Sequence, residues 1–399
     1  MMPPFAAVSS KPPYQTMHHE VVCNYLNKGR SMQMTSRKDF IRTTSLAAAG
    51  FVGGCATAPK AAAWKPDENA FIKSVLLHLG SAMWTDVNTL LEGDKPPSAD
   101  PNWGSYNWDS YKARKDYLQT SDAMWREFTD AAKAHGFNMV VIDIGEALAY
   151  PSHPELAVKG TWSVDKMRRE LDRLREMGLE PIPKLNFSTT HNAWMREWRH
   201  KVSSPEYLDT VDDLIRDVAE VFDHPRLFHI GYDEESIGHQ GEWGRYEYIV
   251  VRRGKLWWHD FLRCVSTVRE EGCRAWCFSD KIWKEPKAFD ANMPRDVVMC
   301  PWAIRGEKEP ESVHNTCIGE MARLGFDMIP MVSTYSTKNE GISEEEPNFA
   351  SAYCEKVIPK KQLKGYIFGP WTLTVPGIPH DKYMASLPVV ENMFKRFGH

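Results

Sequence analysis

The sequence predicts an α/β fold: a single parallel (β/α)8 barrel that follows an N-terminal export signal. Three observations favour this class. Eight apolar runs of strand length follow one another after residue 70. Amphipathic helical stretches separate most of them, and repeated β-then-α alternation indicates a parallel sheet. Polar or aromatic residues end most of the strands, at the edge where such a barrel builds its active site.

The eight apolar runs after residue 70 are the expected strands. They are Ser74–Met83, Asn138–Ile144, Glu180–Phe187, Leu227–Tyr232, Arg274–Phe278, Val297–Trp302, Asp327–Thr334 and Leu363–Phe368. Helices are expected at Asp122–His135, Val164–Met177, Pro205–Phe222, Gly254–Glu271, Glu311–Leu324 and His380–Phe397. Gly136, Gly178 and Gly325 each follow a helix, as C-terminal caps do. The connection after the fifth strand is short for a full helix, so a doubly wound open sheet is the alternative fold.

The N-terminus has the layout of a targeting segment. Residues 36–55 have a basic start, a short apolar middle and small residues before Cys55, which is typical of an export signal. The stretch before Cys55 resembles a lipoprotein cleavage box, which would make Cys55 the lipidated first residue of the mature chain. We therefore expect an N-terminal extension and signal over 1–55, a linker over 56–69 and the barrel over 70–399. A disordered tail with a chance Cys is the alternative.

This signal predicts a periplasmic or cell-envelope lipoprotein of a bacterium, in contact with a membrane only through its lipid. The chain has a formal charge of −4, and the part after residue 55 carries −8. A nucleic-acid partner is therefore not expected, because it requires a basic face. Fifteen Trp and fourteen Tyr suit the apolar faces of sugars, although buried aromatic rings are more often core. The partner predicted is a glycan or oligosaccharide.

The strand ends supply the candidate site. Taken in chain order from the second strand to the eighth, these residues are Asp143 and Glu146, Lys184, Asn186 and His191, Asp233 and Glu234, Asp280, Trp302, Tyr335, and Trp371. Their spacing does not demand a metal, although Asp143, His191 and Asp233 could be assembled into a metal site. We predict no metal and no cofactor.

The adjacent pair Asp233 and Glu234 carries the chemical prediction. Cleavage of a glycosidic bond needs an acid for the leaving oxygen and a negative group near the oxocarbenium-like transition state. A neighbouring charge and an apolar wall would keep Glu234 protonated. Successive strand residues point to opposite sides, so both carboxyls face one pocket only if the strand has already turned, which Gly231 favours. Helix capping is the structural alternative for the pair.

The other candidates also have structural alternatives. Asp143 and Asp280 could be ion-pair partners of Lys184 or Lys281, and the tryptophans could be barrel core. His191 is more often a hydrogen-bonded structural group than a ligand.

The segment FHIGYDEES resembles the HxGGDE segment of family 20 glycoside hydrolases, the β-N-acetylhexosaminidases, with Tyr232 in place of the second Gly. EPIPKLNFSTTH is similar to that family's third strand and FSDKIW to its fifth. The resemblance implies that Glu234 is the general acid/base and that Asp233 orients the substrate 2-acetamido group. It also implies that Tyr335 binds the acetamido carbonyl and that Trp302 and Trp371 form an aromatic wall. Lys184 and Asn186 depart from the Glu and Asp that the family has on this strand.

The leading hypothesis is an exo-acting glycoside hydrolase for N-acetylated amino sugars, with substrate-assisted retaining catalysis. The alternatives are a glycosidase of another sugar, in which Glu234 works with Asp143, Glu146 or Asp280, and a non-catalytic carbohydrate-binding barrel.

Overall fold

The computed structural model describes residues 65–86, 114–241, 246–304, 309–334, 342–396 and 398. The predicted signal with Cys55 and the candidate Tyr335 lie outside these residues. In the described part, none of the helices combines the length and apolarity needed to cross a bilayer.

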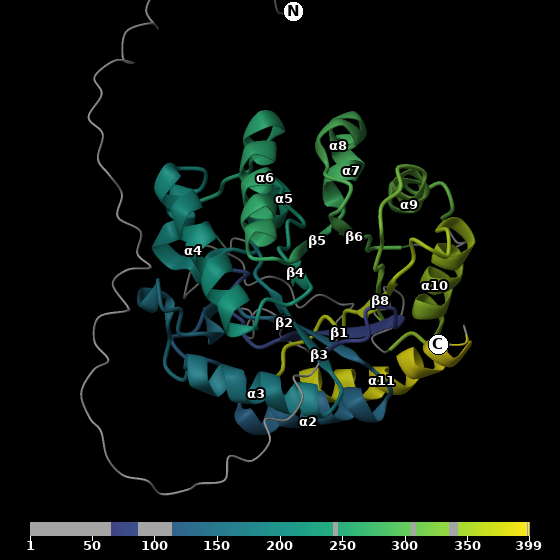
Figure 1. Ribbon diagram of the computed structural model, residues 1–399, viewed down its shortest axis with the longest axis horizontal. Coiled ribbons are helices and arrows are strands. Elements are labelled where there is room, and N and C mark those ends of the chain that lie inside the picture. The colour runs from purple at the N-terminus through teal and green to yellow at the C-terminus, as the bar shows by residue number, and fades with distance from the viewer. Residues whose placement is uncertain are drawn as a thin grey trace, which may run out of the picture. The chain divides into compact units, whose positions relative to one another are not determined.

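Eight parallel strands form one closed sheet (Figure 1). They are β1 (Ile72–His78), β2 (Met139–Asp143), β3 (Glu180–Lys184), β4 (Leu227–His229), β5 (Arg274–Phe278), β6 (Val298–Cys300), β7 (Met331–Val332) and β8 (Gly365–Phe368). The paired order is β6-β5-β4-β3-β2-β1-β8-β7. A bridge from Met299 to Met328 joins the β6 and β7 sides and closes the ring. The predicted barrel is confirmed, and the open sheet is excluded.

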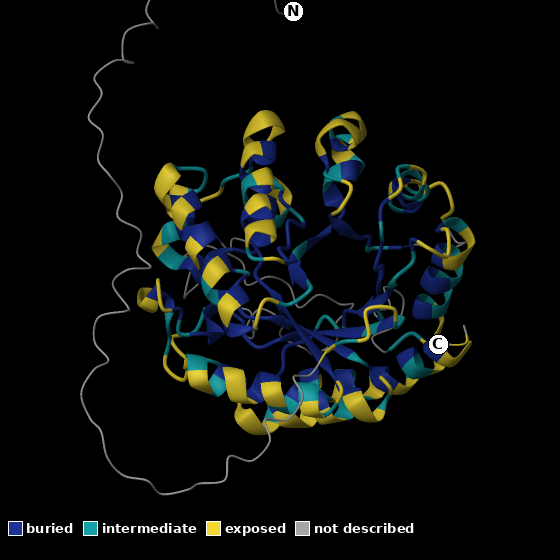
Figure 2. Cartoon of the chain, viewed as in Figure 1, coloured by how far each residue is buried: buried dark blue, intermediate teal, exposed yellow. Residues whose placement is uncertain are grey.

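Helices surround the strands, with buried faces turned inward and exposed faces outward (Figure 2). The longer ones are α2 (Asp122–Ala134), α3 (Val164–Glu176), α4 (Pro205–Val221), α6 (Gly254–Glu270), α9 (Val313–Arg323), α10 (Glu345–Val357) and α11 (Ile378–Arg396). The shorter ones are α5 (Ile237–Gly241), α7 (Asp280–Lys284), α8 (Pro286–Asn292), η3 (Gly145–Ala147), η4 (Pro154–Leu156) and η5 (Ala193–Lys201). Gly136, Gly178 and Gly325 have positive φ just after α2, α3 and α9, as C-terminal caps require.

Strand alternation divides the apolar residues into two cores. Inward residues such as Leu76, Val141 and Trp276 fill the barrel interior. Outward neighbours such as Val75 and Val140 pack with the helices in a second cluster. Because side chains alternate along a strand, the inward row of β2 ends at Asp143 and that of β3 at Lys184. This alternation delivers polar side chains to one end of the interior.

The structure differs from the expected elements in several places. Six strands end before the expected bound, because the chain leaves the ladder earlier: β1, β2, β3, β4, β6 and β7. β7 also begins late, at Met331. The short connection after β5 holds two brief helices, α7 and α8, instead of one long one. Helix α10 was not among the expected helices. Six cysteines of the described part are free and buried.

Candidate active site

The chain turns sharply between β4 and the acidic pair. Gly231, Tyr232 and Glu234 all have positive φ, of 73°, 70° and 54°. A Cβ on Gly231 would lie 2.0 Å from Asn186 Oδ1, so only glycine fits there. Non-glycine residues in this region are strained and need strong support from their surroundings. The Tyr232 ring provides it, since it is buried against Trp257 and Phe261.

This turn brings both carboxyls of the pair to one imidazole. His191 Nδ1 lies 3.5 Å from Asp233 Oδ1, and His191 Nε2 lies 3.5 Å from Glu234 Oε2. Burial lowers the pKa of His191, but the carboxylates of Asp233 and Glu234 raise it more, so its pKa lies above the ordinary value. The expectation that the strand has already turned at this pair is confirmed.

Asp233 is the buried member of the pair. Its Oδ1 accepts a hydrogen bond from Asn186 Nδ2 at 2.8 Å, and Ser188 Oγ donates to its carbonyl oxygen. Burial would raise the pKa of Asp233, but His191, Lys184 and Asn186 together hold it well below the ordinary value. Asp233 is therefore a fixed carboxylate, and its Oδ2 accepts no hydrogen bond from any residue that the structure describes.

Glu234 is the accessible member. Its side chain is 27% exposed, against 11% for Asp233 and 7% for His191. Its backbone is held on both sides: the amide donates to Asp280 Oδ2 at 2.9 Å, and the carbonyl accepts from Thr190 Oγ1 at 2.7 Å. His239 Nε2 lies 3.6 Å from its Oε1. A ligand from solvent reaches this carboxyl first.

Asp143 and Lys184 form a buried ion pair deeper in the barrel. Lys184 Nζ donates to Asp143 Oδ2, and His78 Nδ1 lies 3.4 Å from the same oxygen. Burial would raise the pKa of Asp143, but Lys184 and His78 lower it below its ordinary value. Burial lowers the pKa of His78, and Lys184 adds to that effect against the pull of Asp143. The contacts of Asp143 therefore fit the structural alternative, in which it is the ion-pair partner of Lys184.

Glu146 holds the backbone that follows β1. Its Oε1 accepts from Ser81 N at 2.7 Å, and both of its oxygens accept from Ala82 N at 3.1 Å. Burial raises the pKa of this carboxyl despite those bonds. The residue is 2% exposed, and its contacts are those of a loop anchor.

Asp280 connects Glu234 to the two tryptophans. Trp302 Nε1 donates to Asp280 Oδ1 at 2.5 Å. The rings of Trp302 and Trp371 meet edge to face, 6.3 Å apart, and pack on the interior core. Both rings are only partly buried, so they form an apolar surface above the barrel core.

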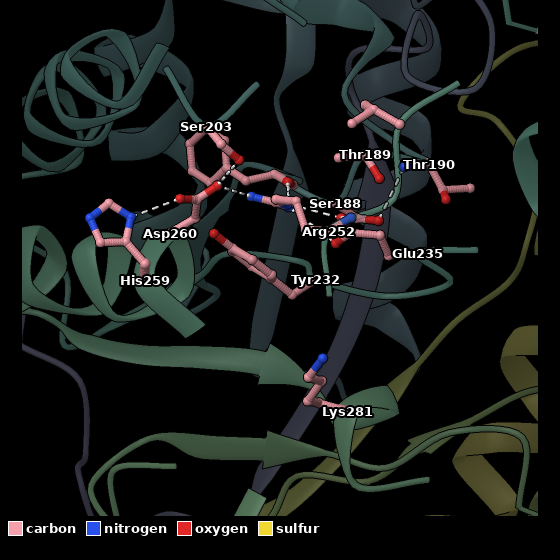
Figure 3. A network of polar contacts seen from close by, with 12 residues as sticks. Ser188, Thr189, Thr190, Ser203, Tyr232, Glu235, Arg252, His259, Asp260 and Lys281 are labelled. Atoms are coloured by element: carbon pink, nitrogen blue, oxygen red, sulfur yellow. Dashed lines mark hydrogen bonds and ion pairs between the residues drawn. The ribbon is translucent and has the colours of Figure 1, made fainter. Parts of the chain in front are cut away.

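A buried charge network centred on Arg252 contacts the residues of the turn (Figure 3). Arg252 lies between Glu235 and Asp260: its Nε donates to Glu235 Oε1 at 2.9 Å and its Nη1 to Asp260 Oδ2 at 3.2 Å. Its guanidinium also lies 5.1 Å from the centre of the Tyr232 ring. Glu235 therefore serves the loop, while its neighbour Glu234 faces the site.

His191, Asp233 and Glu234 offer ligand atoms within 4.8 Å of one another. However, two different nitrogens of the imidazole face the two carboxylates. A metal ion is bound by one imidazole nitrogen while the other meets an outer partner. The contacts on both nitrogens fit a ring that links the two carboxyls.

Most of the candidates therefore converge. Hydrogen bonds and close charged contacts join Asn186, His191, Asp233, Glu234 and Asp280, and Trp302 is joined to them through Asp280. Two further residues, Thr190 and His239, contact Glu234 but were not predicted. Both lie in long connections after strands, where spacing along the sequence carries no signal of contact.

The comparisons with known proteins concern the fold. No family model matches the chain, and no curated protein does. Among solved structures, β-N-acetylhexosaminidase from Bacteroides fragilis matches with a TM-score of 0.53 at 11% identity, over 81% of this chain and 65% of its own. The resemblance in fold is confirmed.

Two further structures agree with this finding. The β-hexosaminidase of Streptomyces plicatus matches with a TM-score of 0.52 at 14% identity, over 82% of this chain and 64% of its own. The family 20 β-N-acetylhexosaminidase of Streptomyces coelicolor matches with a TM-score of 0.51 at 14% identity, over 79% of this chain and 63% of its own. This chain therefore spans less than two thirds of each of the three proteins.

Proposed function

We propose that the chain is an exo-acting glycoside hydrolase for N-acetylated amino sugars, with substrate-assisted retaining catalysis. Glu234 protonates the leaving oxygen and later takes a proton from water. Asp233 orients the 2-acetamido group, whose carbonyl oxygen attacks the anomeric carbon. The observation that carries the proposal is the different surroundings of the adjacent carboxyls: Asp233 is 11% exposed and accepts a hydrogen bond from Asn186, whereas Glu234 is 27% exposed.

The contacts of the pair support these two roles. Asp233 is held as a carboxylate, with Oδ2 left to accept a hydrogen bond from an acetamido N–H. Glu234 has the more exposed side chain and a fixed backbone, as a proton donor to a bound ligand requires. The partly buried rings of Trp302 and Trp371 offer an apolar surface for one sugar ring. The solved S. plicatus β-hexosaminidase holds GlcNAc as its product.

The other carboxyls favour substrate assistance over a protein nucleophile. Asp143 is taken up by Lys184 and His78, and Glu146 by two backbone amides. Both oxygens of Asp280 accept hydrogen bonds, from the Glu234 amide and the Trp302 indole, and burial and the charge of Asp233 raise its pKa to about 8. None of these three offers a free carboxylate for attack on the anomeric carbon.

The test is hydrolysis of aryl glycosides of N-acetylhexosamines by wild type and Glu234→Gln. We expect the variant to lose about 10²–10⁴-fold in kcat/KM, the usual contribution of a positioned acid. Glu320→Gln, on the exposed face of α9, is the matched control and should keep wild-type activity. A thiazoline mimic of the bicyclic intermediate should inhibit the wild type.

Three results would contradict the proposal. Cleavage of other glycosides with no response to the thiazoline favours a second carboxyl as nucleophile. Glycan binding without turnover favours a non-catalytic barrel. Full activity of Glu234→Gln overturns the assignment of the acid.

We also propose export and lipid attachment at Cys55, on the pattern of residues 36–55. Incorporation of a labelled fatty acid into the wild type, and its loss in Cys55→Ala, is the expected result. Equal labelling of both proteins would contradict it.

A further inference from the structure

Asp280 occupies a position that the proposed reaction does not explain. It is the first residue of α7, directly after β5, and it is 8% exposed. A carboxyl at a helix start commonly binds the helix's own amide groups. Here both oxygens instead contact groups on other elements, the Glu234 amide after β4 and the Trp302 indole after β6. Capping of α7 therefore does not explain this side chain.

The hydrogen bond from Glu234 N to Asp280 Oδ2 satisfies a backbone amide that lies beyond the end of the β4 ladder. The β4 ladder ends at His229, and Glu234 has a φ of 54°. Such a backbone is strained and persists only where its surroundings fix it. Asp280 Oδ2 and Thr190 Oγ1 fix the amide and the carbonyl of Glu234 respectively. The direction of the Glu234 side chain depends on these two bonds.

The bond to Trp302 connects the acid to the aromatic surface. The Trp302 ring is only partly buried and packs against Phe278, Trp283 and Trp371, and this ring packing alone does not fix the direction of its Nε1 edge. The hydrogen bond from Nε1 to Asp280 Oδ1, at 2.5 Å, sets it. One carboxyl group thus holds the accessible acid and the apolar wall in a fixed relation.

The surroundings of Asp280 disfavour the charged form of a carboxyl group. Burial raises the pKa of Asp280, and the charges of Asp233 and Glu234 raise it further. An apolar or amide side chain would avoid that cost. Costly carboxyls are found more often at functional sites than in structural roles.

We propose that Asp280 is a positioning residue that holds the proton donor Glu234 and the wall residue Trp302 in register for catalysis. This inference rests on the proposed function. Asp280 acts on the reaction through these two residues. Its loss therefore impairs proton delivery more than it impairs sugar binding.

The experiment compares two aryl N-acetylhexosaminides, one with an activated leaving group such as dinitrophenol and one with an unactivated phenol. An activated phenolate leaves without a proton, so its release does not depend on the position of the acid. Variants are Asp280→Asn, Trp302→Phe and the double variant. Asp212→Asn is the matched control, because Asp212 is also buried and hydrogen-bonded, between α4 and α6.

For Asp280→Asn we expect kcat/KM on the unactivated substrate to fall by at least about tenfold, part of the 10²–10⁴-fold due to a positioned acid. On the activated substrate it should change by less than about threefold. The Kd for N-acetylglucosamine, measured by calorimetry, should stay near the wild-type value. Trp302→Phe should cost activity in the wild type but add little to Asp280→Asn, because the single acceptor oxygen of an asparagine cannot link the Glu234 amide to the Trp302 indole as the two carboxyl oxygens do.

Equal losses on both substrates would overturn the proposal, as would the same loss in Asp212→Asn. Additive effects of the two site variants would overturn the coupling. A wild type that cleaves neither substrate refutes the proposed function instead, so the two failures are distinguishable.

Discussion

The buried pair of Asp143 and Lys184 allows a stability prediction with a defined magnitude. Their side chains are 1% and 3% exposed, and Lys184 Nζ donates directly to Asp143. Removal of one partner from such a pair leaves an uncompensated buried charge, which costs about 3–5 kcal/mol. We expect Lys184→Met to lose that much free energy of unfolding at pH 8.

The loss should depend on pH because His78 also faces Asp143, at 3.4 Å. In the wild type, burial and Lys184 keep the pKa of His78 below its ordinary value. Without Lys184, the Asp143 charge raises the pKa of His78, and a proton on either residue neutralises the site. Stability lost by Lys184→Met at pH 8 should therefore be partly regained as the pH falls to 5.5.

Urea unfolding of the full chain at pH 5.5 and pH 8 is the assay. Lys184→Met/Asp143→Asn removes both charges and should lie within about 2 kcal/mol of the wild type, since a neutral site needs no counter-ion. Lys166→Met breaks the exposed pair with Asp122 and should cost no more than about 1 kcal/mol. A loss below 1 kcal/mol for Lys184→Met at pH 8, or one independent of pH, would refute the reasoning.

Two further outcomes follow from the site. Tyr232→Gly relieves a positive φ, which should stabilise the fold by about 1–2 kcal/mol, but it removes a buried ring worth about 3–5 kcal/mol. We expect a net loss of about 2–3 kcal/mol in the free energy of unfolding measured with urea. A stabilised variant would contradict the packing argument. For Asp280, the folded pKa of about 8 lies above the unfolded value of 3.8, so its stabilising contribution is complete below about pH 4 and is lost as the pH rises through 8. The Tm of Asp280→Asn relative to wild type should therefore rise between pH 5 and pH 9, and a constant difference in thermal unfolding would count against a buried protonated carboxyl.

The barrel and much of the site were predictable because they depend on short-range patterns. Apolar runs alternating with amphipathic stretches indicate parallel strands, and strand ends indicate one edge of the barrel. The position of Asp233 and Glu234 at this edge therefore followed from their place after a buried run. Period-two alternation also accounts for the inward direction of Asp143 and Lys184.

The remaining features depend on contacts distant in sequence. The ion pair of Asp143 with Lys184 joins neighbouring strands, so sequence spacing left it as one of two alternatives. Thr190 and His239 reach Glu234 only through the folding of two long connections. The two bonds of Asp280 join elements after β4, β5 and β6, and no local pattern in the chain encodes such a link.

The bridge that closes the barrel has a consequence for its motion. β6 and β7 share no ladder, and their sides are held by bonds such as Met299 N to Asp327 O at 2.9 Å and Met331 N to Pro301 O at 2.8 Å. Local opening occurs where backbone pairing is sparse, so we expect the amide protons here to exchange with solvent before those of β1 and β2. Trp302 lies beside this seam, whereas Asp233 follows β4, which pairs on both sides. We therefore expect local opening on the aromatic side of the barrel before opening between β4 and β5, the paired strands next to the carboxylates.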